Sequence, residues 1–107
     1  MSKTLEQIRQ LVLEGNILIS EHGYDELAAD HIPVRDAVIG LPDAILIEDY
    51  PDYYKGPCVL VLQKDNCQQP IHIVWGIPLG KTAPAVLITA YRPDPARWDE
   101  EFMRRRT

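Results

Sequence analysis

The sequence predicts an α+β domain in which helices are followed by a four-stranded antiparallel meander sheet and a C-terminal helix. Apolar residues recur at helical spacing through the first 40 residues, and from residue 44 onward they form short runs rich in β-branched residues. The connections between these runs are short and hold most of the nine prolines. Short connections favour antiparallel pairing, because a parallel crossover needs about a dozen residues or more.

The helical spacing predicts three helices, over residues 4–14, 21–29 and 33–40. Gly15 ends the first of them, and residues 16–19 follow as a short extended connector. Ser20 is a suitable N-cap for the second helix, since its hydroxyl can accept a backbone N–H of the first turn. Pro33 suits the start of the third helix, where its missing N–H costs nothing.

Four runs are predicted as strands, over residues 44–49, 58–64, 71–77 and 85–91. The segments between them are rich in turn-forming residues. Asp94 and Pro95 are expected to open the C-terminal helix, which continues through Trp98. The three arginines at 104–106 then lie at its C-terminal end, where cations suit the helix dipole.

The composition indicates a single domain over residues 1–107, with a net charge of −5. No apolar run approaches the roughly 18 residues that a membrane span needs, and the N-terminus lacks a signal-peptide pattern, so we expect a cytoplasmic protein without a membrane partner. The charge is uneven: residues 1–54 hold 11 acidic and three basic residues. The acidic half argues against a general nucleic-acid coat, since such affinity comes from Lys and Arg.

Polar side chains are expected to meet on one face of the sheet. Strand alternation separates His72 from the apolar residues on either side of it, and it places Thr89 and Tyr91 on a common face of the last strand, with Arg92 at its end. A histidine near neutral pKa is suited to general acid–base chemistry. The alternative is that His72 and Tyr91 only pack against each other across two strands.

The second helix carries His22, Glu26 and Asp30 on one face, because they are four residues apart. A His and a carboxylate at this spacing can bind a metal, but an acidic, solvated helix face explains them better, since a third ligand is missing from the pattern. The chain has no glycine-rich phosphate loop and no CxxC motif, and Cys58 and Cys67 are too few for a zinc site. We therefore expect no metal and no cofactor.

Two further features are open to more than one interpretation. Tyr50, Tyr53 and Tyr54 border or lie in the proline-rich connection 51–57, where they can stack on nucleic-acid bases or form part of a protein interface. The arginines at 104–106 can contact phosphate or can simply be a solvated helix end. The sequence does not decide between these alternatives.

Several ordered motifs resemble a known family. They are ILISEH at 17–22, IEDYP at 47–51, VLVL at 59–62, PIHIVW at 70–75 and LITAYRP at 87–93. In order and spacing they are similar to the domain of unknown function DUF4258, over residues 17–93. That family is grouped with the barnase–EndoU–colicin–RelE-like fold. The grouping implies a RelE-like curved antiparallel sheet with helices on one face, metal-independent RNA cleavage by a bacterial toxin, and a cognate antitoxin as partner.

The resemblance also implies a set of catalytic residues. The helix-opening histidine of the family corresponds to His22, and the polar sheet residues correspond to His72, Thr89 and Tyr91, followed by Arg92. In such a ribonuclease the 2′-hydroxyl attacks the adjacent phosphate. A histidine would act as base or acid, and an arginine would hold the developing negative charge.

A non-catalytic interaction module is the alternative function. The family usually carries arginines one and two helical turns after the helix-opening histidine, and this chain has Glu26 and Asp30 there. Together with the acidic residues 1–54, these carboxylates would suit a basic partner protein or self-association. The runs 58–64 and 85–91 are apolar on both faces, which is typical of a sheet whose second face is covered, for example by the partner in a homodimer.

Overall fold

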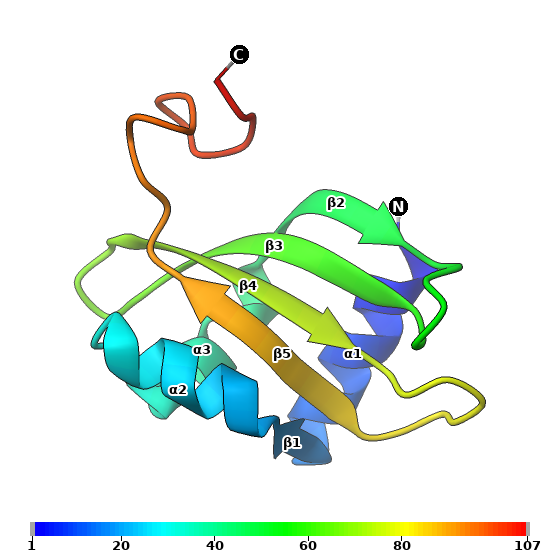
Figure 1. Cartoon of the computed structure of the whole chain (residues 1–107). Helices are drawn as coiled ribbons and strands as arrows, with labels where there is room; N and C mark the ends of the chain where they lie inside the picture. Colours follow the sequence, from blue (N-terminus) through cyan, green and yellow to red (C-terminus); the bar gives the residue numbers. More distant parts are fainter. Residues whose placement is uncertain (1, 107) are drawn as a thin grey trace.

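A computed structural model describes residues 2–106 and contains a five-stranded mixed sheet with three helices (Figure 1). The helices are α1 (Lys3–Leu13), α2 (Glu21–Ala29) and α3 (Val34–Ile39), followed by the short 3₁₀ turn η1 (Leu41–Asp43). The strands are β1 (Ile17–Ile19), β2 (Ile45–Tyr50), β3 (Cys58–Lys64), β4 (Pro70–Gly76) and β5 (Ala85–Tyr91). They lie side by side in the order β1-β5-β4-β3-β2.

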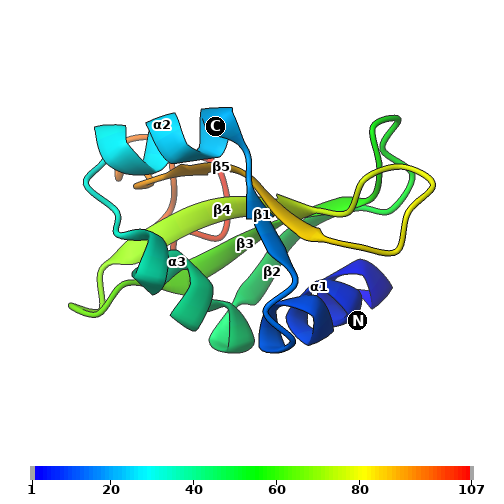
Figure 2. The same ribbon diagram turned by 90° about the horizontal axis from the view of Figure 1, so that it is seen from below.

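The core lies between one face of the sheet and helices α1 and α3, while α2 packs against β5 (Figure 2). Ile8 of α1 meets Ile73 and Trp75 of β4 there, and all three side chains are fully buried. We call the opposite face of the sheet the outer face. Strand register places the following residues on it: Glu48, Tyr50, Cys58, Leu60, Leu62, His72, Val74, Gly76, Thr89 and Tyr91.

The predicted α+β class and the positions of the three helices and four strands are confirmed to within a few residues. Ser20 caps α2 as expected, since its hydroxyl accepts the N–H of Gly23 at 2.9 Å. A Cβ atom at Gly23 would lie 2.7 Å from the Leu87 carbonyl oxygen. Only glycine therefore lets the first turn of α2 pack this closely on β5, and this packing positions His22.

The predicted four-stranded antiparallel meander is wrong. The connector at 16–19 forms a fifth strand, β1, which pairs in parallel with β5 through Ile17 opposite Ala85 and Ile19 opposite Leu87. The sheet is therefore mixed, and β5 is an interior strand. The physical reason is that half-buried Ile17 and Ile19 pack on the core, while their backbone groups satisfy the edge of β5 that would otherwise be open.

The predicted C-terminal helix is also wrong. Residues 93–106, which we call the C-terminal segment, form turns and one isolated bridge between Trp98 and Arg105. The Asp99 carboxylate accepts the N–H groups of Met103 and Arg104, and Phe102 has a φ of +60°, which a helix does not permit. Side-chain bonds to local backbone thus replace the helical ladder.

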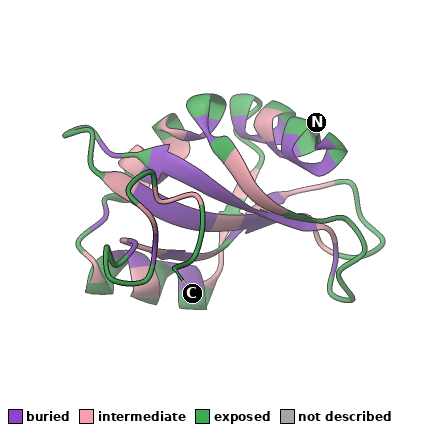
Figure 3. Cartoon of the chain, turned by 90° about the horizontal axis from the view of Figure 1, so that it is seen from above, coloured by how far each residue is buried: buried purple, intermediate pink, exposed green. Residues whose placement is uncertain are grey.

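The C-terminal segment crosses part of the outer face (Figures 1 and 3). Trp98 is buried there and packs against His72. The cover that we expected from a homodimer partner is therefore supplied in part by the same chain. Within residues 2–106, no helix is long and apolar enough to span a membrane.

Candidate functional site

The five predicted site residues come from α2, β4, β5 and the residue that follows β5, and they lie in three groups. These are His72 with Tyr91, His22 with Thr89, and Arg92 among carboxylates and carbonyls. Within residues 2–106, no hydrogen bond or ring contact joins the His72 group to the His22 group. The sequence predicted that His72, Thr89 and Tyr91 meet on one face with Arg92 beside them; the structure keeps the three on that face but pairs Thr89 with His22 and turns Arg92 toward Asp30 and Asp65.

His72 lies directly opposite Tyr91 in the pairing of β4 with β5. Its Nε2 is 2.7 Å from the carbonyl oxygen of Phe102, and its Nδ1 is 3.1 Å from the Tyr91 hydroxyl. Because a carbonyl can only accept, Nε2 carries the hydrogen and Nδ1 accepts the Tyr91 O–H. The Trp98 ring packs edge-on at a centroid distance of 4.4 Å, and the His72 side chain is 0% exposed.

Burial decides the protonation of this pair. It lowers the pKa of His72, although the hydrogen bond to Phe102 acts in the opposite direction. Burial also raises the pKa of Tyr91. At neutral pH the pair is therefore a neutral imidazole that accepts a hydrogen bond from a protonated phenol. In such a pair both groups are uncharged before the reaction, and the hydroxyl can transfer its proton to the ring during it.

Tyr91 also lines a cavity of about 680 Å³ between the end of β5 and the C-terminal segment. We call it the arginine-lined cavity, and its walls are formed by Tyr91, Arg92, Asp94, Ala96, Arg97, Trp98, Arg105 and Arg106. Four of these residues are arginines; Arg92 and Arg105 are already paired with carboxylates, whereas Arg97 and Arg106 make no ion pair within residues 2–106. Guanidinium groups match the geometry of phosphate oxygens, so the cavity is suited to a phosphate group.

The contacts of Arg105 hold the C-terminal segment on the sheet. Its guanidinium donates to both carboxylate oxygens of Glu48 on β2, at 2.7 and 3.2 Å, and lies over the Trp98 ring at 4.8 Å. The hydrogen bond from Arg105 lowers the pKa of Glu48. Sequence reasoning treated this arginine as a phosphate contact or a solvated helix end. It gave Glu48 no role, although Glu48 lies within the IEDYP motif at 47–51.

The second group lies on the surface where α2 meets β5. His22 Nε2 is 3.1 Å from Glu26 Oε1 and 3.4 Å from the Thr89 hydroxyl, which itself donates to Glu26 at 3.2 Å. The His22 side chain is 67% exposed. A carboxylate that holds one ring nitrogen orients the imidazole and leaves the other nitrogen free to exchange protons. In the described part of the chain, no three His, Cys, Asp or Glu side chains are grouped to hold a metal ion.

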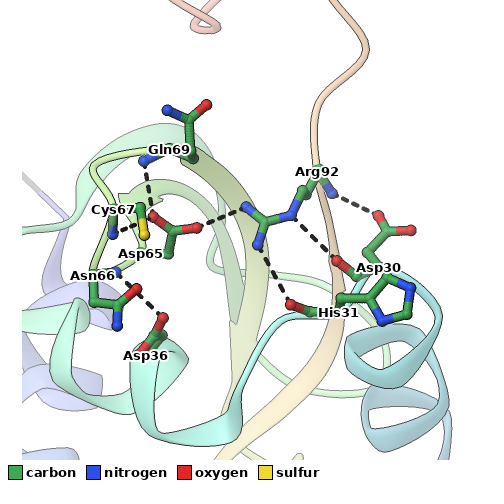
Figure 4. A network of polar contacts seen from close by, with 8 residues as sticks. All are labelled: Asp30, His31, Asp36, Asp65, Asn66, Cys67, Gln69 and Arg92. Atoms are coloured by element: carbon green, nitrogen blue, oxygen red, sulfur yellow. Dashed lines mark hydrogen bonds and ion pairs between the residues drawn. The ribbon is translucent and has the colours of Figure 1, made fainter.

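Arg92 is a structural clamp (Figure 4). Its N–H donates to the Asp30 carboxylate at 2.8 Å, and its guanidinium donates to the Asp30 carbonyl at 3.2 Å and to the Asp65 carboxylate at 3.0 Å. These bonds tie the end of α2 to the β3–β4 turn. Asp30 thus partners the arginine at the end of β5.

Asp65 was not predicted, although it begins the turn after β3. One carboxylate oxygen accepts the N–H groups of Cys67 and Gln69, and the other accepts Arg92. Burial raises the pKa of Asp65, but the two amide bonds and the Arg92 guanidinium together hold it below its ordinary value. An aspartate at the start of a turn is the sequence signal that could have found it.

Comparison with known proteins identifies the family. The family described as a domain of unknown function, DUF4258, matches residues 19–92. The chain belongs to the DUF4258 family. The match runs from the end of β1 to Arg92, so it contains all five predicted site residues, whereas the C-terminal segment that covers His72 lies beyond it. No curated protein and no solved structure matches the chain.

Proposed function

We propose that this DUF4258 protein is a metal-independent ribonuclease that acts as the toxin of a toxin–antitoxin pair, with the scissile phosphate held in the arginine-lined cavity. One observation carries the proposal: the Tyr91 hydroxyl, bonded to His72 Nδ1, belongs to a residue that lines the same cavity as four arginines. A group that can exchange a proton and cations that can hold a phosphate are thus adjacent.

The reaction begins with attack of the RNA 2′-oxygen on the adjacent phosphorus. As the O2′–P bond forms, the 2′-hydroxyl gives its proton to the Tyr91 oxygen, and Tyr91 passes its own proton to Nδ1 of His72. Arg97 and Arg106 offset the negative charge that develops on the phosphate oxygens. His72 acts through Tyr91, and is therefore a positioning residue.

The P–O5′ bond then breaks, and the leaving 5′-oxygen takes a proton from the His22 ring, which Glu26 orients. Thr89 and Tyr91 are two residues apart on the same face of β5, a separation of about 7 Å. The proposed acid His22 contacts Thr89 and the proposed base is Tyr91, so acid and base lie at neighbouring positions on one face of β5. The products are a 2′,3′-cyclic phosphate and a 5′-hydroxyl, and no metal or redox partner takes part.

The antitoxin part of the proposal rests on the grouping that the family resemblance implies. The acidic residues 1–54 describe the chemistry of such a partner, because their net charge of −8 would attract a basic protein. Binding there would leave the arginine-lined cavity, which is formed by residues 91–106, available to RNA.

The direct test is cleavage of a defined RNA by purified protein in the presence of a chelator. Tyr91→Phe keeps the ring but removes the hydroxyl, and should slow cleavage by about 10²-fold or more. Tyr24→Phe, on an exposed tyrosine of α2, is the matched control and should cleave at the wild-type rate. Intact RNA with the wild-type protein, or equal rates for the two variants, would overturn the proposal.

The specific observation that favours a second function is that Arg92 and Arg105 are already paired with carboxylates while His72 is sealed under the C-terminal segment. A non-catalytic interaction module would have this property. If the protein is such a module, wild type and Tyr91→Phe should bind the protein encoded by a neighbouring gene with the same affinity. Both should leave RNA intact. Calorimetry of that pair, beside the cleavage assay, separates the two functions.

A further inference from the structure

Two loops, 51–57 and 78–84, lie at the far end of the sheet from the C-terminal segment (Figures 1 and 2). They expose aromatic and apolar side chains. Together with the end of β2, they form the tyrosine platform, which consists of Tyr50, Tyr53, Tyr54, Lys55 and Leu79. Tyr54 is the most exposed of these residues in the 51–57 loop that carry a ring, at 70%. Grouped exposed apolar side chains usually mark a binding surface.

Backbone hydrogen bonds make the platform rigid. Leu79 donates its N–H to the Lys55 carbonyl at 3.1 Å, and Gly56 donates to the Tyr53 carbonyl at 2.9 Å. Gly56 has a φ of +125°, and a Cβ there would lie 2.1 Å from the Ile77 carbonyl oxygen. The loop 51–57 is therefore locked against its neighbour in a shape that only glycine allows. Because these loops are already ordered, little entropy is lost when a ligand binds.

The ring geometry suits flat ligands with nearby negative charge. The Tyr53 and Tyr54 rings have centroids 4.8 Å apart and are tilted by 45°. The ammonium of Lys55 lies 5.7 Å from the centroid of Tyr54. Nucleic-acid bases stack on exposed aromatic rings, and a lysine beside the ring can meet the phosphate. Lys55 and Lys81 outweigh Asp52 in the two loops, 51–57 and 78–84, so the loops themselves are net positive, while Asp49 lies beside Tyr50 on β2.

The platform and the arginine-lined cavity lie at opposite ends of the outer face. Tyr50 lies opposite Cys58, and Cys58 lies opposite Gly76, so the three share the face that carries His72 and Tyr91. Along β4, Gly76 is four residues from His72, a distance of about 13 Å. Glu48 lies between them, but its charge is paired with Arg105. An extended strand can therefore reach from the cavity to the platform.

We propose that the tyrosine platform stacks the bases of single-stranded RNA whose phosphates are held in the arginine-lined cavity. The inference rests on the proposed function for its choice of RNA. Stacking requires an unpaired base, so single strands are the substrate class and duplexes are excluded. A protein partner is the competing occupant, but the lysine beside the Tyr54 ring and the net positive loops favour a polyanion.

The experiment measures binding without cleavage. A fluorescent 2′-O-methyl octauridylate has no 2′-hydroxyl to attack, and its length falls in the range of roughly 4–16 nucleotides that such surfaces cover. Tyr54→Ala should weaken its binding by roughly 5- to 100-fold, whereas Tyr54→Phe should bind as the wild type does. Tyr24→Ala, on an exposed tyrosine of α2, is the matched control and should also bind normally.

An abasic octamer of equal charge distinguishes stacking from charge. It should bind wild type and Tyr54→Ala equally, because it has no bases to stack. Unchanged octauridylate binding in Tyr54→Ala, or an equal loss with the abasic octamer, would overturn the platform. The platform would also be overturned if the wild type binds no octauridylate but self-associates, and Tyr54→Ala abolishes that self-association. A second copy of the chain would then be the occupant of this surface.

The platform and the ribonuclease can fail independently. If octauridylate binds through Tyr54 but cleavable RNA stays intact, the platform stands and the proposed catalysis fails. If RNA is cleaved with the same KM in wild type and Tyr54→Ala, catalysis stands and the platform fails.

Discussion

The two histidines of the candidate site make similar bonds in opposite environments. His72 contacts the hydroxyl of Tyr91, and His22 contacts the hydroxyl of Thr89. Both hydroxyls belong to β5 and lie two residues apart on it. His72 is fully buried, whereas the side chain of His22 is 67% exposed. The residue types alone would suggest equivalent roles. The difference in burial predicts that His72 contributes to stability as well as to chemistry, and that His22 contributes to chemistry alone.

The C-terminal segment causes this difference. Without it, His72 would lie on an open sheet face, because Trp98 and Phe102 supply the packing and the carbonyl that enclose the ring. Nothing comparable covers His22 in residues 2–106, since it lies on the first turn of α2 beside the solvent. The sealed histidine therefore depends on a segment beyond the family match, while the exposed one lies within the matched region itself.

Replacement of the sealed histidine should have the largest effect on stability. His72→Ala leaves a cavity under Trp98 and deprives the Tyr91 hydroxyl of its acceptor. We expect the free energy of unfolding to fall by about 2–4 kcal/mol, measured by urea denaturation. A loss below about 0.5 kcal/mol would mean that the C-terminal segment does not seal the ring in solution.

The pH dependence of stability sharpens the same comparison. Burial lowers the pKa of His72, so below about pH 6.5 the unfolded chain binds a proton that the native state resists. The free energy of unfolding should therefore decrease as pH falls from about 7 to 5, with a slope of at most about 1.4 kcal/mol per pH unit. His72→Gln cannot ionise and should lose this slope.

The carboxylates do not obscure that pH window. The pKa values of Glu48 and Asp65 are lowered from ordinary values of 4.5 and 3.8, so the stability they contribute is lost only in more acidic solution. Urea denaturation of wild type and His72→Gln at several pH values is the measurement. Parallel curves for the two proteins would contradict a buried neutral histidine.

The parts of the fold that could be predicted from the sequence are those that neighbouring residues determine. Helix spacing, the Ser20 cap and the β-branched runs placed the three N-terminal helices and four strands correctly. The missing strand β1 has only three residues, and its pairing with Ala85–Leu87 depends on a contact between distant parts of the chain. The C-terminal helix failed because Asp99 offered the backbone closer partners than the helix did.

The candidate site likewise has features that local sequence determines and features that distant contacts determine. Strand alternation placed His72, Thr89 and Tyr91 on a common face, and register confirms that placement. The sequence could not show that Arg92 would be held by Asp30 and Asp65, because those partners are 62 and 27 residues away. Burial of His72 likewise depends on a segment with no strong pattern of its own.

Loosening the C-terminal segment should have a moderate effect. Glu48→Gln removes the charge that holds Arg105, an exposed bidentate pair worth about 0.5–1 kcal/mol. Trypsin should then cleave after the arginines at 104–106 a few-fold faster, a factor of about five for 1 kcal/mol. Glu101→Gln makes the same change in charge on an exposed residue of the segment and should be cleaved at the wild-type rate. Equal rates for both variants would show that Glu48 does not hold the segment.

Replacement of the exposed histidine should give the smallest change in stability. It therefore separates a role in catalysis from a role in stability. His22→Ala removes a solvent-exposed ring and one contact each with Glu26 and Thr89, which still bond to each other. The free energy of unfolding should change by less than about 0.5 kcal/mol. Loss of the proton donor for the leaving oxygen should nevertheless slow RNA cleavage by about 10²-fold. Because the fold survives, such a loss cannot be attributed to unfolding, whereas the same loss in His72→Ala could be. Cleavage at the wild-type rate in stable His22→Ala would remove His22 from the mechanism and leave Tyr91 with His72 as its only proton-transfer groups.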